Sequence, residues 1–298
     1  MSAPAQAPVT SPVASPVARR RRPRVGADVL AVVVAGVVAF PLYWMLLSAL
    51  KPTTELMSGD ALPYTLHPTL DAFTRVLSVE NVGRYLLNSV LVAAVAVPGA
   101  MFCAFFAAVA LTRYRFRLRT TLLVTVLVAQ MVPVEALTIP LFFLFRSLGM
   151  VVPELGLNHL GSLMLVHICF STPFAIWMLR GFVAAVPEEV EEAARLDGAS
   201  GLRFVRSILF PLVAPGLVAV SIFGFISTWN DFLYPRTFII SAQENQTLPL
   251  AILNFFKPDQ NDWGAIMAGS VIMTLPVLVF FVFVQRHLVS GLAGAVKG

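Results

Sequence analysis

The segment that decides the fold is residues 86–111, LLNSVLVAAVAVPGAMFCAFFAAVAL, which contains no charged side chain. A helix of about 20 apolar residues is long enough to cross the hydrocarbon core of a bilayer, which is roughly 30 Å thick. Strands of a membrane barrel would instead be segments of about 10 residues with alternating polarity. Residues 86–111 are therefore expected to form a transmembrane helix.

Five further apolar segments have a similar length, and together they predict an all-α integral membrane protein with one transmembrane domain at residues 25–290. The mean hydropathy is +0.82, and 58% of the 298 residues are hydrophobic. A soluble domain cannot bury that much apolar surface in one core. The six expected spans are approximately residues 25–50, 86–111, 120–145, 160–179, 211–233 and 265–285.

The distribution of basic residues predicts the orientation. If the N-terminus is cytoplasmic, the inside segments carry 15 of the 21 Lys and Arg residues and the outside segments carry 6. Cytoplasmic loops of membrane proteins have an excess of Lys and Arg. Both termini are therefore expected in the cytoplasm. The cluster RYRFRLR at residues 113–119 is expected to anchor this topology rather than to bind nucleic acid.

Residues 1–24 combine Pro, Ala, Ser and Val with an arginine cluster, a composition that does not form a packed core. We expect a disordered, basic cytoplasmic tail. A signal peptide is the alternative, because a basic stretch precedes an apolar one. The apolar stretch at residues 25–50 is longer than the usual h-region of roughly 7–15 residues, so the first helix is expected to stay in the mature protein.

The sequence lacks the patterns of a catalytic, metal or nucleotide site. Cys103 and Cys169 form no CxxC pair, and no two histidines have the spacing that places them on one helical face. The C-terminal GLAGAVKG, residues 291–298, has no Ser or Thr after its lysine, unlike a phosphate-binding loop. We expect no metal, no bound cofactor and no enzyme activity. Energy for transport would come from an ion gradient or from another subunit.

A different kind of segment, PEEVEEAARLDGAS at residues 187–200, follows the fourth expected span and is therefore expected in the cytoplasm. The proline at its start, the glutamates in its first turn and Gly198 at its end predict a short helix. Glu191 and Arg195 are spaced to form an ion pair on that helix. The serine that follows is expected to cap a second helix, so residues 187–211 form a helix–turn–helix at the membrane face.

The acidic character of this first helix favours a protein partner. Amphipathic helices that lie on lipid are typically rich in Lys and Arg, whereas this one carries mostly glutamate. The side chains of Ala193 and Ala194, beside Val190, are small, so the backbone of another protein can approach this part of the helix closely. A helix that lies on lipid, or that is only solvated, remains the alternative.

The same segment resembles the EAA loop of ABC importer permeases: Glu192-Ala193-Ala194 is followed four residues later by Gly198, and then by Ile208 and Pro211. The chain departs from the family pattern at Phe210, where the family has leucine. The resemblance extends from about residue 25 to residue 298 and is to the carbohydrate branch, similar to the shorter membrane subunit of the maltose importer. The segments that carry it are SALKP at 48–52, LNS at 87–89, VPVEALTIPLF at 132–142, WNDFLYP at 229–235, TLPLA at 247–251 and QRHLVSGLAGAVKG at 285–298.

The resemblance implies a type I ABC importer permease fold in the bacterial cytoplasmic (inner) membrane, as one multi-pass subunit of an ATP-driven, binding-protein-dependent sugar importer. Its partners would be a second homologous permease subunit, two ATPase subunits that bind ATP and Mg, an extracytoplasmic solute-binding protein, the sugar and the lipid bilayer. The chain would form half of the translocation path. A permease for a polyol phosphate or another non-sugar solute is one alternative, and an ion-coupled secondary transporter is another.

The resemblance also implies roles for residues of the loop. Glu192 would contact a groove of the ATPase, and Ala193 and Ala194 would permit close seating. Gly198 would supply the bend, and Asp197 would organise the turn. The tail at residues 291–298 would reach toward the ATPase pair; its candidate residues are Gly294, Lys297 and Gly298.

Three polar residues are candidates for the translocation path or a gate. Glu135 falls inside the third expected span between two prolines, where a structural role is an equal alternative. Asn230 and Asp231 end the fifth span on the outside, where helix capping and turn formation are the alternative. Trp229 is expected to be an interfacial anchor rather than a sugar-stacking platform. The polar segment at residues 234–263 would either meet the binding protein or be a solvated connector.

Overall fold

The computed structural model describes residues 25–59, 62–78, 82–256 and 261–295, and all regular structure in these ranges is helical. The expected tail at residues 1–24 lies outside the described residues. The chain divides into two units, residues 1–43 and residues 44–298, and each is described by itself.

The first unit contains the start of helix α1 (Val25–Leu50), up to Tyr43. Valine, leucine and phenylalanine side chains of this part are about half exposed or more on every side of the helix, among them Val32, Val37 and Phe40. A helix that is hydrophobic all round is typical of a membrane span. The helix has the bounds that the sequence predicts.

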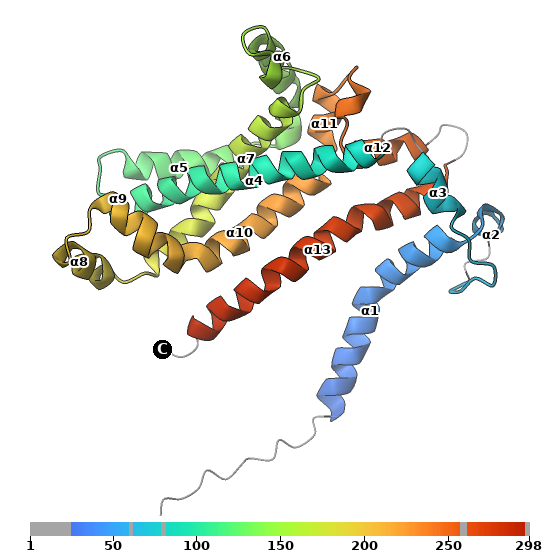
Figure 1. Cartoon of the computed structure of the whole chain (residues 1–298), viewed down its shortest axis with the longest axis horizontal. Helices are drawn as coiled ribbons and strands as arrows, with labels where there is room; N and C mark the ends of the chain where they lie inside the picture. Colours follow the sequence, from blue (N-terminus) through green and yellow to red (C-terminus); the bar gives the residue numbers. More distant parts are fainter. Residues whose placement is uncertain (1–24, 60–61, 79–81, 257–260, 296–298) are drawn as a thin grey trace, which may run out of the picture. The chain divides into compact units, whose positions relative to one another are not determined.

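Three long helices form the core of the second unit: α4 (Val82–Arg113), α7 (Leu160–Ala184) and α10 (Phe210–Asn230). They pack against one another along much of their length (Figure 1). Small side chains let membrane helices approach closely. On α4 this is the role of a row of fully buried alanines spaced four residues apart, Ala100, Ala104 and Ala108.

One glycine sets the approach of α10 to α7. A Cβ atom added at Gly216 would overlap the ring of Phe182. The two helices therefore lie as close as they do only because residue 216 has no side chain.

The last helix, α13 (Trp263–Ala295), packs against α10 and the short helix α3 (Asp71–Ser78). Arg75 on α3 donates to both carboxylate oxygens of Asp262, at 2.8 and 3.0 Å, and this fixes the start of α13. A bidentate pair of this kind is the strongest geometry that arginine and carboxylate adopt. The remaining short helices of this unit, apart from those described below, are α2 (Thr53–Met57), η2 (Pro153–Leu155), η4 (Gln243–Asn245), α12 (Leu248–Ile252) and η5 (Leu253–Phe255).

The third expected span is not one continuous helix, which corrects the prediction for residues 120–145. Helix α5 (Arg119–Ala129) is bent by 91° from the helical segment Val134–Gly149, at a break over residues 130–133. This second segment consists of the 3-10 turn η1 (Val134–Leu137) and helix α6 (Thr138–Gly149). Pro133 causes the break, because it has no N–H to donate and disfavours helical backbone in the residue before it. By length and composition, the described residues contain five helices that can cross a membrane, or six if the bent pair is one span.

The fifth expected span begins earlier than predicted. A short helix, α9 (Gly201–Phe204), continues through a π-helical turn, η3 (Val205–Leu209), directly into α10. The second helix of the acidic segment therefore runs directly into this span. Of its apolar side chains, Val205 and Leu209 are buried, whereas Leu202 is 72% exposed.

Much of the described part of the segment after α10 is folded against the bundle. It forms helix α11 (Leu233–Phe238), which buries Tyr234 and Phe238. Asn158, with a left-handed φ of 65°, accepts hydrogen bonds at its side-chain oxygen from the backbone N–H groups of Ile240 and Ser241, at 2.7 and 2.9 Å. Asparagine tolerates this backbone conformation better than most residues.

Two side chains of α4 hold the next part of the same segment. Asn88 donates to the backbone carbonyls of Glu244 and Gln246, both at 2.8 Å. The Ser89 hydroxyl accepts from the backbone N–H of Leu248 at 2.9 Å. The Ser89 bond joins the LNS and TLPLA segments, which are about 160 residues apart in the sequence, and the Asn88 bonds hold the residues just before TLPLA.

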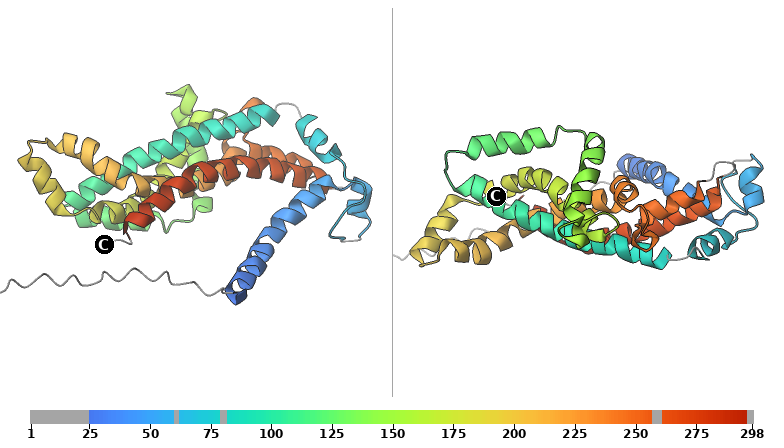
Figure 2. Two further views of the ribbon diagram at one scale, coloured as in Figure 1. Left: turned by 60° about the horizontal axis from the view of Figure 1, so that its bottom comes forward. Right: turned by 90° about the horizontal axis from the view of Figure 1, so that it is seen from above.

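The second unit has two distinct ends (Figure 2). Helices α8 (Glu188–Leu196) and α9 lie at one end together with the C-terminal ends of α4, α7 and α13. Helices α3 and α12 and the start of α13 lie at the opposite end. The basic cluster that begins at Arg113 follows α4, so it lies at the same end as α8.

Candidate functional site

The helix–turn–helix expected at residues 187–211 is present. Helix α8 begins after Pro187, and Gly198 ends it with a left-handed φ of 77°. The N–H of Ala199 donates to the carbonyl of Ala194 at 2.9 Å, which closes the helix end in the way typical of a glycine-terminated helix. The Ser200 hydroxyl accepts from the backbone N–H of Arg203 at 3.4 Å, so the predicted cap of the second helix is also confirmed.

Helix α8 has one face against the bundle and one open face. Ala194 is 4% exposed and packs in the core cluster shared by α4, α7 and α10. Glu192 and Ala193 are exposed, and Leu196 is 89% exposed. The two alanines therefore differ: Ala193 is open to a partner, whereas Ala194 is covered by its own chain and lets α8 lie close to the bundle. This corrects the expectation that both present a surface to a partner.

A buried arginine ties α8 to the helices behind it. The Arg113 guanidinium donates to the carbonyls of Val183 and Val186, at 3.1 and 2.6 Å, and its Nε lies 3.8 Å from the Glu191 carboxylate. Glu191 also accepts from Arg195 at 2.6 Å, as the sequence predicts. The hydrogen bonds to the end of α7 are short, so they hold the elbow more strongly than the longer ion pair does.

Sequence reasoning assigned Arg113 only to topology and missed this link. No local sequence pattern predicts this link, because the carbonyls that Arg113 reaches lie 70 and 73 residues later in the chain. The exposed Leu196 was also missed. An apolar residue directly before Asp197-Gly198 was the available signal.

The remaining candidates for contact with the ATPase are Asp197 and three residues of the C-terminal tail. Asp197 is exposed at the C-cap position of α8, and its role in the turn stays a prediction. Gly294 falls within α13. Lys297 and Gly298 lie outside the described residues.

The three path candidates come together around one cavity of about 820 Å³. Glu135 is in the turn η1 at the break between α5 and α6, so it is not inside a continuous span as expected. Asn230 is the last residue of α10, and Asp231 is its C-cap. The Oδ1 atom of Asp231 accepts from the backbone N–H of Leu233 at 3.0 Å, which closes the turn between α10 and α11. Its other oxygen, Oδ2, is buried and accepts no hydrogen bond.

Two further residues of this cavity were not predicted as site residues. His167 on α7 places its Nε2 atom 3.4 Å from Asp231 Oδ2. Tyr234 on α11 is 4% exposed, and its hydroxyl has no hydrogen-bond partner. Burial raises the pKa of the Tyr234 phenol well above its usual range, and the nearby carboxylates of Asp231 and Glu135 add to this effect. The phenol therefore keeps its proton and can donate.

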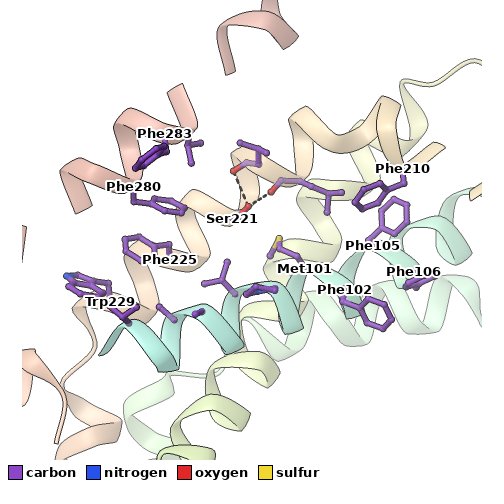
Figure 3. A pocket seen from close by; sticks show the side chains of 18 of the residues that line it. Met101, Phe102, Phe105, Phe106, Phe210, Ser221, Phe225, Trp229, Phe280 and Phe283 are labelled. Carbon is purple, nitrogen blue, oxygen red and sulfur yellow. Dashed lines mark hydrogen bonds between the residues drawn. The ribbon is translucent and has the colours of Figure 1, made fainter. Parts of the chain in front are cut away.

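A larger cavity, of about 1000 Å³, lies between α4, α10 and α13 and is almost entirely apolar (Figure 3). Aromatic side chains such as Phe105, Phe225 and Phe280 line it. The Ser221 hydroxyl at its wall donates to carbonyls of its own helix. A sugar hydroxyl buried there would lose its hydrogen bonds to water without replacement. The smaller, polar cavity is the one whose chemistry suits a carbohydrate.

Trp229 is buried inside the protein, which differs from the exposed interfacial anchor that was expected. It is 1% exposed, and its indole N–H donates to the carbonyl of Met273 at 3.1 Å. The Phe225 ring stacks on it with centroids 5.5 Å apart. Trp229 is therefore a packing residue that joins α10 to α13, and it has no free face for a sugar.

Comparison with known proteins agrees with this arrangement. Residues 96–294 match the family described as binding-protein-dependent transport system inner membrane component. The chain belongs to this family. It is thus a multi-pass inner-membrane component of an ABC transporter, a membrane subunit and not the ATPase. The matched range includes α8 and all the residues that line the polar cavity.

Named relatives of this permease cover nearly the whole chain. It is 39% identical over 277 residues to the diacetylchitobiose uptake system permease protein DasC of Streptomyces coelicolor, covering 92% of this chain and 98% of that one. It is 33% identical to the trehalose transport system permease protein SugB of Mycobacterium tuberculosis, covering 91% and 96%. A crystal structure of a bacterial ABC transporter for the acidic polysaccharide alginate has the same fold, with a TM-score of 0.72 at 19% identity and coverage of 88% and 95%.

Proposed function

We propose that this chain is the permease subunit of an ATP-driven, binding-protein-dependent sugar importer, and that it forms half of the translocation path. The names of its relatives, which are permeases for diacetylchitobiose, trehalose and galactooligosaccharides, support a sugar as the solute. Both termini are in the cytoplasm in this proposal. The remaining components are a second homologous permease, two ATPase subunits that bind ATP and Mg, and an extracytoplasmic solute-binding protein.

The observation that carries the proposal is the open face of α8. Glu192 and Ala193 form an acidic, low-profile surface, and beside it Leu196 exposes 89% of its area. Exposed apolar groups within a polar rim are typical of protein interfaces. The counterpart that fits this surface has basic residues around an apolar groove. An ATPase subunit with such a groove is the proposed partner.

The connection of α8 to the bundle supports a mechanical role. Arg113 holds the elbow between α7 and α8, and Ala194 lets α8 pack tightly against the core. A displacement of α8 by its partner therefore moves the ends of α4 and α7 as well. Alternating access by rocking of helical bundles needs a rigid connection of this kind. Asp197 and Gly198 form the turn that positions α9, and the tail with Gly294, Lys297 and Gly298 is assigned to the same ATPase side.

The polar cavity is the proposed place of solute passage. Glu135, Asn230 and Asp231 supply hydrogen-bonding groups at its wall, and Tyr234 adds an unpaired hydroxyl. Its volume of about 820 Å³ falls within the usual range of ligand pockets, roughly 300–1,000 Å³. The sister permease would close the other side of the path.

The proposal is tested by purifying the tagged chain from its native host in a mild detergent. An ATPase subunit and a second permease are expected to co-purify, and the reconstituted complex should import sugar only with ATP and the binding protein. The Leu196→Asp variant should lose the ATPase subunit. Leu66→Asp is the matched control, because Leu66 is 78% exposed but lies outside α8. A chain that purifies without any ATPase, from membranes that lack ATP-dependent sugar uptake, contradicts the proposal.

A further inference from the structure

The ionisable side chains that line the polar cavity are mostly acidic. Among the described residues that line it, Glu135 and Asp231 have carboxylates, His167 is the single basic side chain, and there is no lysine or arginine. If His167 is neutral the wall carries two negative charges, and if it is protonated it carries one. The cavity is therefore net negative in either state of the histidine.

Its polar groups are also incompletely satisfied. Tyr234 is 4% exposed, and its buried hydroxyl has no hydrogen-bond partner. Asp231 Oδ2 likewise accepts no hydrogen bond, although it lies 3.4 Å from His167. Buried polar groups are nearly always paired, so an unpaired donor and an unpaired acceptor among the residues of one cavity leave room for hydrogen bonds to a solute. A sugar hydroxyl can both donate and accept such bonds, and an ammonium group can donate.

We propose that this cavity admits neutral or amino-bearing saccharides and excludes anionic ones, such as uronates and sugar phosphates. The inference rests on the proposed function, because it assumes that the solute passes through the cavity. Glu135 and Asp231 are the residues that set the selectivity. Sugar hydroxyls and ammonium groups can donate to these carboxylates, whereas an anionic solute finds no lysine or arginine among the described residues of the wall.

The size of the effect follows from Coulomb's law. An anionic group about 6 Å from one carboxylate, at an effective dielectric constant near 20, is disfavoured by roughly a hundredfold. Solvent and salt screening reduce this factor in an open cavity. A discrimination of about tenfold between a small cation and a small anion is therefore the expected scale.

The chain contains its own probe of this charge. Cys169 lines the cavity and is exposed, and Cys103 is the only other cysteine in the sequence. In a Cys103→Ala background, Cys169 is reacted with a methanethiosulfonate that carries a trimethylammonium group, and separately with one of similar size that carries a sulfonate. Both reagents attack the same thiolate, so its population cancels in the ratio of their rates. The ratio is divided by that of a free thiol in solution.

The experiment uses the full-length chain in its importer complex in lipid nanodiscs. The normalised ratio should favour the cationic reagent by about tenfold, and it should fall to about twofold or less in the Glu135→Gln, Asp231→Asn double variant. Glu154→Gln is the control, because Glu154 is exposed and does not line the cavity; it should leave the ratio unchanged.

A ratio near one in the parent protein overturns the inference, even if the double variant fails to insert. A high ratio that the double variant retains overturns the assignment to these two carboxylates. The readout needs no transport, so the two proposals fail separately. A tenfold ratio without sugar uptake counts against the proposed function alone, whereas sugar uptake with a ratio near one counts against charge selection alone.

Discussion

Arg113 and Val186 are joined by a hydrogen bond of 2.6 Å, from the guanidinium at the end of α4 to the carbonyl in the elbow between α7 and α8. A second bond reaches Val183 at 3.1 Å. Cationic side chains at a helix C-terminus satisfy carbonyls that have no partner within the helix. The elbow is therefore fixed by one side chain whose exposed fraction is 6%.

Replacing this side chain should loosen α8. Arg113→Gln leaves the carbonyls of Val183 and Val186 without their buried donor, which should lower the free energy of unfolding by about 2 kcal/mol. In the reconstituted importer, sugar uptake should fall more than ATP hydrolysis, because α8 moves without the bundle. Arg115→Gln, at an exposed arginine two residues on, is the control. If Arg113→Gln and Arg115→Gln have the same unfolding free energy and the same sugar uptake, Arg113 does not fix the elbow.

The bend after α8 should require glycine. At a φ of 77°, a Cβ atom is strained, so Gly198→Ala should destabilise the loop by about 1 kcal/mol and reduce uptake, whereas Gly198→Asn should be milder. Gly201→Ala is the matched control, since a Cβ there meets only the Tyr114 hydroxyl at an ordinary 3.7 Å. Thermal unfolding of the purified complex measures the difference. A Gly201→Ala effect as large as that of Gly198→Ala would be inconsistent with the bend.

The contact between α4 and the segment after α10 should depend on one amide. Asn88 is 4% exposed and donates to two backbone carbonyls, so Asn88→Ala should cost about 2 kcal/mol of unfolding free energy. Faster amide hydrogen exchange at residues 244–248 should accompany the loss. Asn254→Ala, at an exposed position, should change neither quantity. Unchanged exchange in Asn88→Ala would show that other contacts hold this segment.

The Tyr234 hydroxyl should matter for transport and not for stability. It has no partner in the folded chain, so Tyr234→Phe should leave the melting temperature unchanged or slightly raised. If the hydroxyl donates to the solute, the KM for sugar uptake should rise severalfold while ATP hydrolysis is retained. A lower melting temperature with unchanged KM would mean that the hydroxyl has a structural partner instead.

Most of the helices could be predicted from the sequence, because long apolar runs such as residues 86–111 leave few alternatives in a membrane. Gly198 and Ser200 were also predictable, since backbone conformation and capping depend on residues close in sequence. The break in the third span was not predicted. Pro133 was noted, but apolar length alone does not show whether a proline kinks a helix or ends it.

Long-range contacts account for the remaining differences. The LNS and TLPLA segments both resemble segments of the family, yet only the folded chain shows that they lie together. There, Ser89 accepts from the backbone N–H of Leu248, and Asn88 donates to the carbonyl of Glu244. His167 and Asp231 were weighed separately, one as a poor metal ligand and one as a path residue. Trp229 was misjudged because tryptophan at a span end is common at interfaces, and its burial depends on α13.

The central claim is that α8 transmits force from an ATPase to the bundle, and Glu192→Lys tests it most directly. Glu192 is exposed on the open face of α8, so charge reversal should repel the basic groove of the ATPase without disturbing the fold. The measurement is sugar imported per ATP hydrolysed in reconstituted vesicles, with Glu154→Lys as the control. The account predicts normal membrane insertion and a loss of uptake of at least about tenfold, with ATP hydrolysis no longer coupled to it. Uptake per ATP equal to that of the parent protein would contradict it.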